Sequence, residues 1–281
     1  MDEQVLIMEC CKGNMQDLID TNPNGLTSDE FIKFCQNLVD AIQHMHNKNV
    51  IHRDVKPTNI LLMHHNGQTI YKLADFGAAR FLGDNETYGS LYGTFEYVHP
   101  DIFAKFYAKA LDISYPKQTF NDYHELWSVG VTIFEVASGR LPFNPKKGRA
   151  DHKQMYRMMK QKQTDCISAE ETECGINWSR ELPENCHLDE SVKQVITPLL
   201  AGLLQPTNEW SFQHFFEEAK RILYHESTLP IENEQNHAQQ PNWSHKFRMH
   251  PRARRHRPNR ARHMGEIQWW RPKQYRKRLL R

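Results

Sequence analysis

Apolar residues recur at helical intervals after the turn sequence NPNG at 22–25. Thr27 and Glu30 have the spacing of a capping box, which marks the start of a helix. The pattern then predicts a helix over residues 28–48 with one buried face. Its buried positions are Phe31, Phe34, Leu38, Ile42 and Met45.

The most apolar segment of the chain is HELWSVGVTIFEVASG, at residues 124–139. It is apolar almost all round, which predicts a helix that is buried on every side. Gly139 suits the carboxyl-terminal cap of this helix. Weaker helical patterns cover residues 151–160, 188–204 and 210–224.

Strand patterns are shorter. Two apolar runs, 60–63 and 70–74, flank HHNGQ, in which Asn66-Gly67 is a strong signal for a hairpin turn. Residues 5–8 form another short apolar run, and residues 78–101 lack periodicity and are expected to form a long ordered loop. The sequence therefore predicts an α+β fold that is mainly helical and carries a small β-hairpin.

Charge divides the chain into two parts. From Lys246 to the end there are fourteen Lys/Arg and one acid, Glu266, whereas the preceding part is net acidic. Beyond residue 225 the hydrophobic pattern ends, so residues 226–281 are predicted to be a disordered basic tail. The interleaved aromatics of this tail could bind nucleic acid, but a solvated run is the favoured interpretation, and nucleic acid is not an expected partner.

The spacing of the cysteines and the length of the apolar runs indicate the cellular compartment of the protein. The six cysteines show no C-x-x-C spacing, which favours reduced thiols over a disulfide framework or a metal site. The amino terminus lacks the pattern of a signal peptide. No apolar stretch is long enough to span a membrane. We therefore expect a cytoplasmic protein that does not associate with membranes.

The polar loop between the first helix and the hairpin carries a specific motif. His52-Arg53-Asp54 and Asn59 match H-R-D-x-x-x-x-N, and Asp75-Phe76-Gly77 follows the hairpin, an order typical of phosphoryl transfer from ATP. Asp54 would orient the hydroxyl of the substrate as a base, and Lys56 would neutralise charge on the transferred phosphoryl group. Asn59 and Asp75 would supply oxygen ligands to Mg²⁺.

A switch is predicted in the segment GSLYGTFEYVHPD, at residues 89–101. A phosphate on Ser90 would add negative charge that could pair with Arg53 and fix the loop. Thr94 is expected to form hydrogen bonds near Asp54 and Lys56.

These motifs together resemble the carboxy-terminal lobe of a protein kinase of the IκB-kinase-related group. The segments that carry the resemblance are VLIMEC, HRDVKPTN, YKLADFGAAR, SLYGT-EY-HPD, LWSVGVT, LPF and INWS, spread over about residues 5–204. The resemblance implies a kinase-like fold, in which residues 1–12 are the last amino-lobe strand and the hinge. Residues 13–225 would be the carboxy-terminal lobe, with a catalytic loop at 52–59 and an activation segment at 75–101.

The resemblance also implies a site for ATP. Met8 would be the gatekeeper, Glu9 and Cys11 would offer hinge hydrogen bonds to adenine, and Leu61 would lie beneath the ring. Ala74 would lie just before the D-F-G motif, and Ser90 would be the activating serine. The cofactors would be ATP and Mg²⁺, and the partners would be protein substrates and signalling adaptors in innate-immune-type signalling.

The sequence departs from the kinase pattern in several places. Glu125-Leu126-Trp127 stands where kinases usually have Asp-x-Trp, and Asp101 stands where Glu is usual. The longer Glu125 carboxylate could still hold the catalytic-loop backbone, and Asp101 could still form an ion pair.

The glycine-rich loop, the V-A-I-K lysine and the helix-C glutamate do not precede Val5. Two interpretations therefore stay open. One is a serine/threonine kinase, and the other is a catalytically inactive lobe that acts as a binding module or decoy.

Overall fold

The computed structural model describes residues 9–81, 93–110, 120–207 and 210–224. Met8, Ser90, the apolar run 5–8 and the basic tail 226–281 lie outside the described residues. All described residues belong to one unit of the chain, Met1–Pro230.

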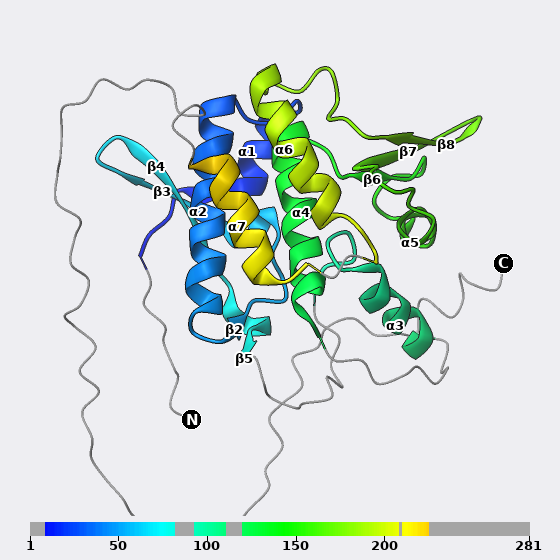
Figure 1. Ribbon diagram of the computed structural model, residues 1–281, viewed down its shortest axis with the longest axis horizontal. Coiled ribbons are helices and arrows are strands. Elements are labelled where there is room, and N and C mark those ends of the chain that lie inside the picture. The colour runs from blue at the N-terminus through cyan, green and yellow to red at the C-terminus, as the bar shows by residue number, and fades with distance from the viewer. Residues whose placement is uncertain (1–8, 82–92, 111–119, 208–209, 225–281) are drawn as a thin grey trace, which may run out of the picture. The chain divides into compact units, whose positions relative to one another are not determined.

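Four helices pack side by side and form the centre of this unit (Figure 1). They bury the apolar faces that the sequence predicts, together with the all-round apolar surface of α4. The predicted helices are confirmed within a few residues at each end. They are α2 (Ser28–His46), α4 (Asp122–Ser138), α6 (Glu190–Leu203) and α7 (Phe212–Leu223).

Helix α2 begins where the sequence predicts, but its cap differs. Thr27 is the N-cap residue, yet its side chain makes no hydrogen bond to a backbone N–H of the helix. The Thr27 hydroxyl instead donates to the Glu30 carboxylate at 3.2 Å. The reciprocal bonds of a capping box are therefore absent between these two residues, because their side chains bond each other.

Helix α4 is buried along almost its whole length, as predicted. Every residue from His124 to Ser138 is buried. Gly139 ends the helix with φ 73°, and a Cβ atom there would lie 2.2 Å from the carbonyl oxygen of Pro23. Glycine therefore serves both the left-handed cap and the close approach of a neighbouring loop.

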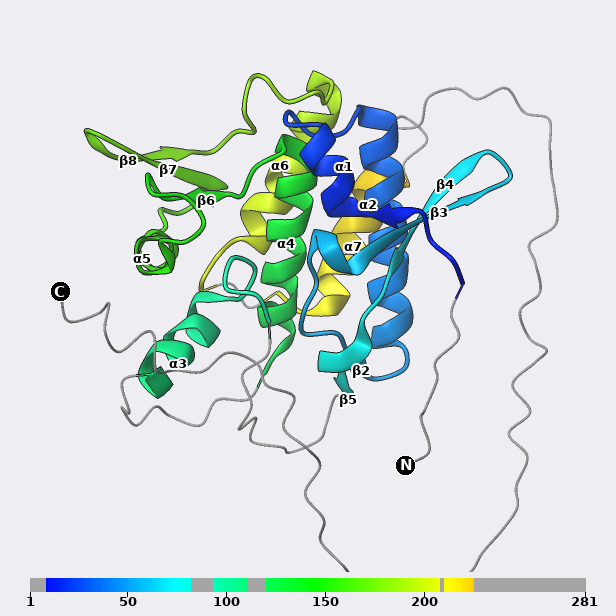
Figure 2. The same cartoon turned by 180° about the vertical axis from the view of Figure 1, so that it is seen from behind.

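The predicted hairpin consists of β3 (Ile60–His65) and β4 (Gln68–Leu73). Asn66 and Gly67 have φ values of 50° and 78°, as a type I′ turn requires. Strand β1 (Gly13–Asn14) pairs with β3. Figure 2 shows the hairpin and α1 (Met15–Thr21) on the side of α2 that faces away from α7.

The prediction of one long loop over residues 78–101 is wrong at both ends. Strand β5 (Arg80–Phe81) pairs with β2 (Val50–Ile51), and α3 (Pro100–Ala110) begins inside the range. A two-residue strand is too short to show periodicity, so the sequence pattern could not reveal it. Among the described residues, no helix has the length and hydropathy needed to cross a membrane.

A second three-stranded sheet was not predicted. It contains β6 (Phe143–Asn144), β7 (Ser168–Thr172) and β8 (Gly175–Ser179), with order β6-β7-β8. Helix α5 (His152–Lys160), which the sequence did predict, lies between β6 and β7 in the chain.

Candidate active site

The side chains of Asp54, Lys56 and Thr94 form a closed hydrogen-bonded group. The Lys56 ammonium lies 2.7 Å from the Asp54 carboxylate and donates to the Thr94 hydroxyl, also at 2.7 Å. The Thr94 hydroxyl in turn donates to Asp54 Oδ1 at 3.2 Å. The structure thus brings together three residues that the sequence predicted for one site, across 40 positions of chain.

Asn59 joins this group to the hairpin. It ends a short 3₁₀ helix, η1 (Pro57–Asn59), and is buried. Its amide nitrogen donates to the Asp54 carbonyl at 2.9 Å and to Asp54 Oδ2 at 3.1 Å. The backbone carbonyl of Asn59 accepts the N–H of Ala74 at 2.8 Å, which places Asn59 beside the residue that precedes Asp75.

Asp75 begins the next turn in a left-handed conformation, with φ 61°. It caps η2 (Phe76–Ala78), and its Oδ1 accepts the N–H of Gly77 at 3.2 Å. The Asp75 carboxylate is exposed to solvent. The two side-chain hydrogen bonds of Asn59 described above use its amide nitrogen and not its amide oxygen. These two oxygen donors suit a hard cation such as Mg²⁺.

Helix α4 supports the site with a set of polar side chains, of which the sequence analysis identified only Glu125. We call this set the polar stripe. Its spacing of i, i+3, i+7 and i+10 places all members on one face. The members are Glu125, Ser128, Thr132 and Glu135, all buried.

Each member of the polar stripe holds a segment of the site. Ser128 donates to the Tyr97 carbonyl at 2.8 Å. The Thr132 hydroxyl donates to the Ser128 carbonyl at 2.8 Å and also lies 3.4 Å from the Val55 carbonyl. Glu135 accepts the hydroxyl of Tyr97 at 2.5 Å. The signal in the sequence was a polar residue at these positions of an otherwise apolar helix.

Glu125 holds the predicted catalytic loop in spite of its departure from the kinase pattern. Its carboxylate accepts the backbone N–H of Arg53 at 2.6 Å, and Arg53 is left-handed, with φ 67°. The Arg53 guanidinium donates to the Ala78 carbonyl at 2.6 Å. Burial raises the pKa of Glu125 to about 7, and the hydrogen bonds from the loop oppose this rise. The predicted pair of Arg53 with a phosphorylated Ser90 lies outside the described residues.

The residues expected to contact adenine lie around one sheet. Lys12, next to Cys11, donates its N–H to the Leu62 carbonyl at 2.9 Å, so the end of the predicted hinge is joined to the residue that follows Leu61. The Glu9 carboxylate pairs with Lys72 at 2.6 Å. Ala74 follows the far end of β4 and is joined to Asn59 as described above.

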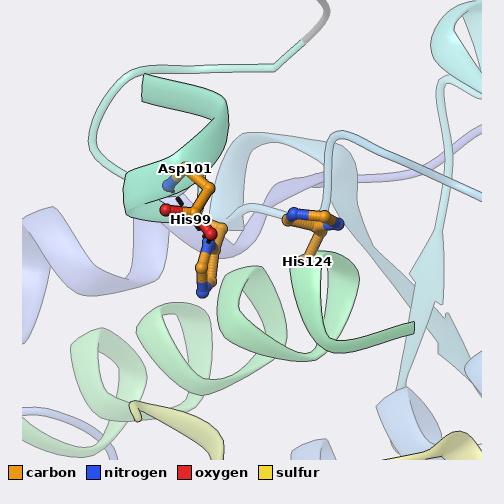
Figure 3. A group of neighbouring side chains, drawn as sticks. All are labelled: His99, Asp101 and His124. Atoms are coloured by element: carbon orange, nitrogen blue, oxygen red, sulfur yellow. Dashed lines mark hydrogen bonds and ion pairs between the residues drawn. The ribbon is translucent and has the colours of Figure 1, made fainter. Parts of the chain in front are cut away.

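His99, Asp101 and His124 converge where α3 and α4 begin (Figure 3). Their nearest ligand atoms lie within 4.8 Å of one another, as a metal site would require. However, His99 Nδ1 accepts the N–H of Asp101 at 3.1 Å, and His124 Nδ1 accepts the N–H of Asn121 at 2.8 Å. The Nδ1 lone pair of each histidine therefore accepts a backbone N–H near the start of a helix. This arrangement favours a structural role over metal binding.

Burial keeps both of these imidazoles neutral. It lowers the pKa of His99 and the pKa of His124 to about 3. Asp101 forms the ion pair that the sequence analysis allowed, with Lys160 at 3.5 Å.

Comparison with known proteins agrees with this geometry. The protein kinase domain family matches residues 1–218. The mouse inhibitor of nuclear factor kappa-B kinase subunit epsilon is 38% identical over 79% of this chain and 32% of its own length. The zebrafish inhibitor of nuclear factor kappa-B kinase subunit alpha is 30% identical over 74% of this chain and 26% of its own.

A more distant relative shares the same domain. The serine/threonine-protein kinase dkf-2 of Caenorhabditis briggsae is 32% identical over 51% of this chain and 11% of its own length. The chain thus spans about a third or less of the length of these relatives. The matched family and these relatives support the resemblance to the IκB-kinase-related group. This chain belongs to the protein kinase family.

Proposed function

We propose that this chain carries the catalytic residues of a serine/threonine protein kinase of the IκB-kinase-related group. The substrates would be protein serines, and the phosphoryl donor would be ATP. The observation that carries the proposal is the closed group of Asp54, Lys56 and Thr94, with Asn59 bonded to Asp54. Such a group fixes an acceptor carboxylate and a cation in one place, as phosphoryl transfer requires.

Asp54 has the role of base. Its Oδ atoms accept from Lys56, Thr94 and Asn59, so the carboxylate is held in one orientation before a substrate arrives. It would accept the proton of the serine hydroxyl and direct that hydroxyl in line with the transferred group. Lys56 lies within 3 Å of the same carboxylate. Its charge would stabilise the developing charge on the phosphoryl oxygens.

Asn59 and Asp75 would hold Mg²⁺ through oxygen atoms. Bound Mg²⁺ supplies positive charge that neutralises the phosphates of ATP. Glu9, Cys11, Leu61 and Ala74 would line the adenine side, with Met8 as gatekeeper. Ser90 would be the activating phosphosite, and Arg53 would be its partner.

The test uses the full chain with and without an amino-terminal kinase lobe joined at Val5. Serine phosphorylation by the lobe-completed chain should depend on ATP and fall by several orders of magnitude in Asp54→Ala and in Asp75→Ala. Asp29→Asn is the matched control, since Asp29 is exposed in the first turn of α2. If the lobe-completed chain is active and Asp54→Ala keeps its turnover, the assigned role of Asp54 is wrong. A folded but inactive lobe-completed chain would favour the binding-module interpretation.

We also propose a signalling context from the resemblance. Two of the relatives are named as inhibitor of nuclear factor kappa-B kinase subunits, which supports action on signalling proteins. We propose the cytoplasm as the place of this action. The partners would be signalling adaptors and protein substrates in innate-immune-type signalling. Affinity purification from cells, with the Asp54→Ala variant used to retain substrates, would test this context.

A further inference from the structure

Arg149 connects a loop outside the catalytic motifs to the polar stripe of α4. Its guanidinium donates to Glu135 Oε1, while the hydroxyl of Tyr97 donates to Glu135 Oε2 at 2.5 Å. The side chain of Glu135 is fully buried, whereas half of the Arg149 side chain is exposed. The two oxygens of one buried carboxylate therefore receive donors from two different segments.

A buried carboxylate needs this kind of pairing. Removing a charge from water is costly unless the charge is paired and hydrogen-bonded. Within the part of the chain that the structure describes, Arg149 is the residue that forms an ion pair with Glu135. Arg149 therefore allows Glu135 to stay charged and to act as a strong acceptor for Tyr97.

Tyr97 transmits this constraint to the site. Its hydroxyl is held by Glu135 and its carbonyl by Ser128, both from α4. Its N–H donates to the Thr94 carbonyl at 2.9 Å, in the turn that Thr94 begins. The hydroxyl of Thr94 contacts Asp54 and Lys56. A shift of Tyr97 would therefore displace Thr94 from both groups.

We propose that Arg149 is a positioning residue of the kinase site, which holds Tyr97 through Glu135 and so keeps Thr94 beside Asp54 and Lys56. Arg149 itself touches none of the groups assigned to the reaction. The effect on catalysis rests on the proposed function, whereas the effect on the conformation of the 94–98 turn does not.

Hydrogen exchange on the full chain tests the conformational effect. In Arg149→Ala, the amides of Tyr97 and Val98, which both bond the Thr94 carbonyl, should exchange about tenfold faster or more, because breaking a buried pair is strongly destabilising. Amides in α7 should change much less. The matched control is Arg140→Ala, which breaks an exposed pair with Glu170 at 3.6 Å and should leave the 94–98 turn unaffected.

Two rescue variants separate positioning from a general loss of stability. Arg149→Lys keeps a cation for Glu135 and should retain most of the protection. Adding Glu135→Gln to Arg149→Ala should restore protection, because the amide oxygen still accepts from Tyr97 and no buried charge remains. If Arg149→Ala does not fold, these two variants decide the question. Failure of the double variant to protect the turn would overturn the proposal, as would unchanged exchange in Arg149→Ala.

A kinetic measurement keeps this inference distinct from the proposed function. In the lobe-completed chain, Arg149→Ala should lower kcat and leave the KM for ATP nearly unchanged, since Arg149 is not assigned to the ATP site. An unchanged kcat with an opened turn would overturn the positioning role alone. Absence of activity in the unsubstituted lobe-completed chain would count against the proposed function and would leave the exchange result standing.

Discussion

The carboxylate of Glu125 lies 2.6 Å from the backbone nitrogen of Arg53, 72 positions earlier in the chain. This bond holds a left-handed residue directly before Asp54. Glu125→Ala should therefore leave a buried N–H without its acceptor and cost about 1–3 kcal/mol in the free energy of unfolding. Urea denaturation measures this cost. Glu125→Gln keeps an acceptor oxygen and should cost less than Glu125→Ala, and equal costs would contradict the role assigned to the bond.

The charge of Glu125 should also make stability depend on pH. Because the pKa of Glu125 is raised to about 7 in the folded state, the folded protein holds a proton that the unfolded chain loses above about pH 4.5. Stability should therefore fall as pH rises from about 4.5 to 7, by an amount on the order of 3 kcal/mol, and then level off. Glu125→Gln should remove this part of the pH dependence. The measurement is the unfolding free energy at pH 5 and pH 8 for both proteins.

The histidine pair should produce the opposite pH dependence at lower pH. The folded pKa values of His99 and His124 are lowered to about 3, so their contribution to stability is present above about pH 6.5. It should be lost progressively as pH falls towards 3. His99→Asn keeps an acceptor for the Asp101 N–H and should flatten the slope of unfolding free energy between pH 6 and pH 4. The exposed residue His44 provides the control, since His44→Gln should leave that slope unchanged.

Two glycines with similar conformations should respond differently to alanine. Gly67 and Gly139 have φ values of 78° and 73°, but a Cβ at Gly67 would meet no atom within 4 Å. Gly67→Ala should cost about 1–2 kcal/mol, from the left-handed backbone alone. Gly139→Ala should cost clearly more, because the added Cβ would clash with the Pro23 carbonyl. Thermal unfolding of the two variants, measured side by side, would contradict this account if the losses were equal.

The hydroxyl of Thr94 should matter more for turnover than for stability. Thr94→Val keeps the volume but removes the contacts with Lys56 and Asp54. We expect kcat of the lobe-completed chain to fall about tenfold, the equivalent of about 1.4 kcal/mol. Thr94→Ser keeps the hydroxyl and should retain most of the activity. Full activity in Thr94→Val together with a loss in Thr94→Ser would show that the methyl group, and not the hydroxyl, is needed.

Long buried elements could be predicted from the sequence because burial imposes a period on many residues at once. Helices α2 and α4 have that length, and the hairpin turn at Asn66 and Gly67 has a specific conformational requirement. The strands β7 and β8 show no such pattern. In SAEET only the small residues Ser168 and Ala169 are buried, and in GINWS no residue is buried. Both sequences carry few β-branched side chains. Strands β7 and β8 pair across a short turn, whereas β6 joins this sheet from a distant segment of the chain.

The residues of the candidate site also fall into a group that the sequence could predict and a group that it could not. Asp54, Lys56, Asn59 and Thr94 could be predicted because each lies in a short motif with fixed spacing. In the polar stripe of α4, the role of Glu125 could be expected from its place in the kinase motif. The roles of Ser128, Thr132 and Glu135 could not, because their partners are backbone groups and a tyrosine that lie far away in the sequence. A polar residue in an apolar helix indicates that a partner exists, but the fold is needed to identify that partner.

The polar stripe has a consequence for how related sequences can diverge. Glu135 and Arg149 satisfy each other, so a single substitution at either position leaves an unpaired group, and lineages should replace both together. Glu125 serves a backbone N–H, which no substitution can remove except proline at position 53. Position 125 should therefore alternate between aspartate and glutamate without a compensating change, whereas positions 135 and 149 should covary.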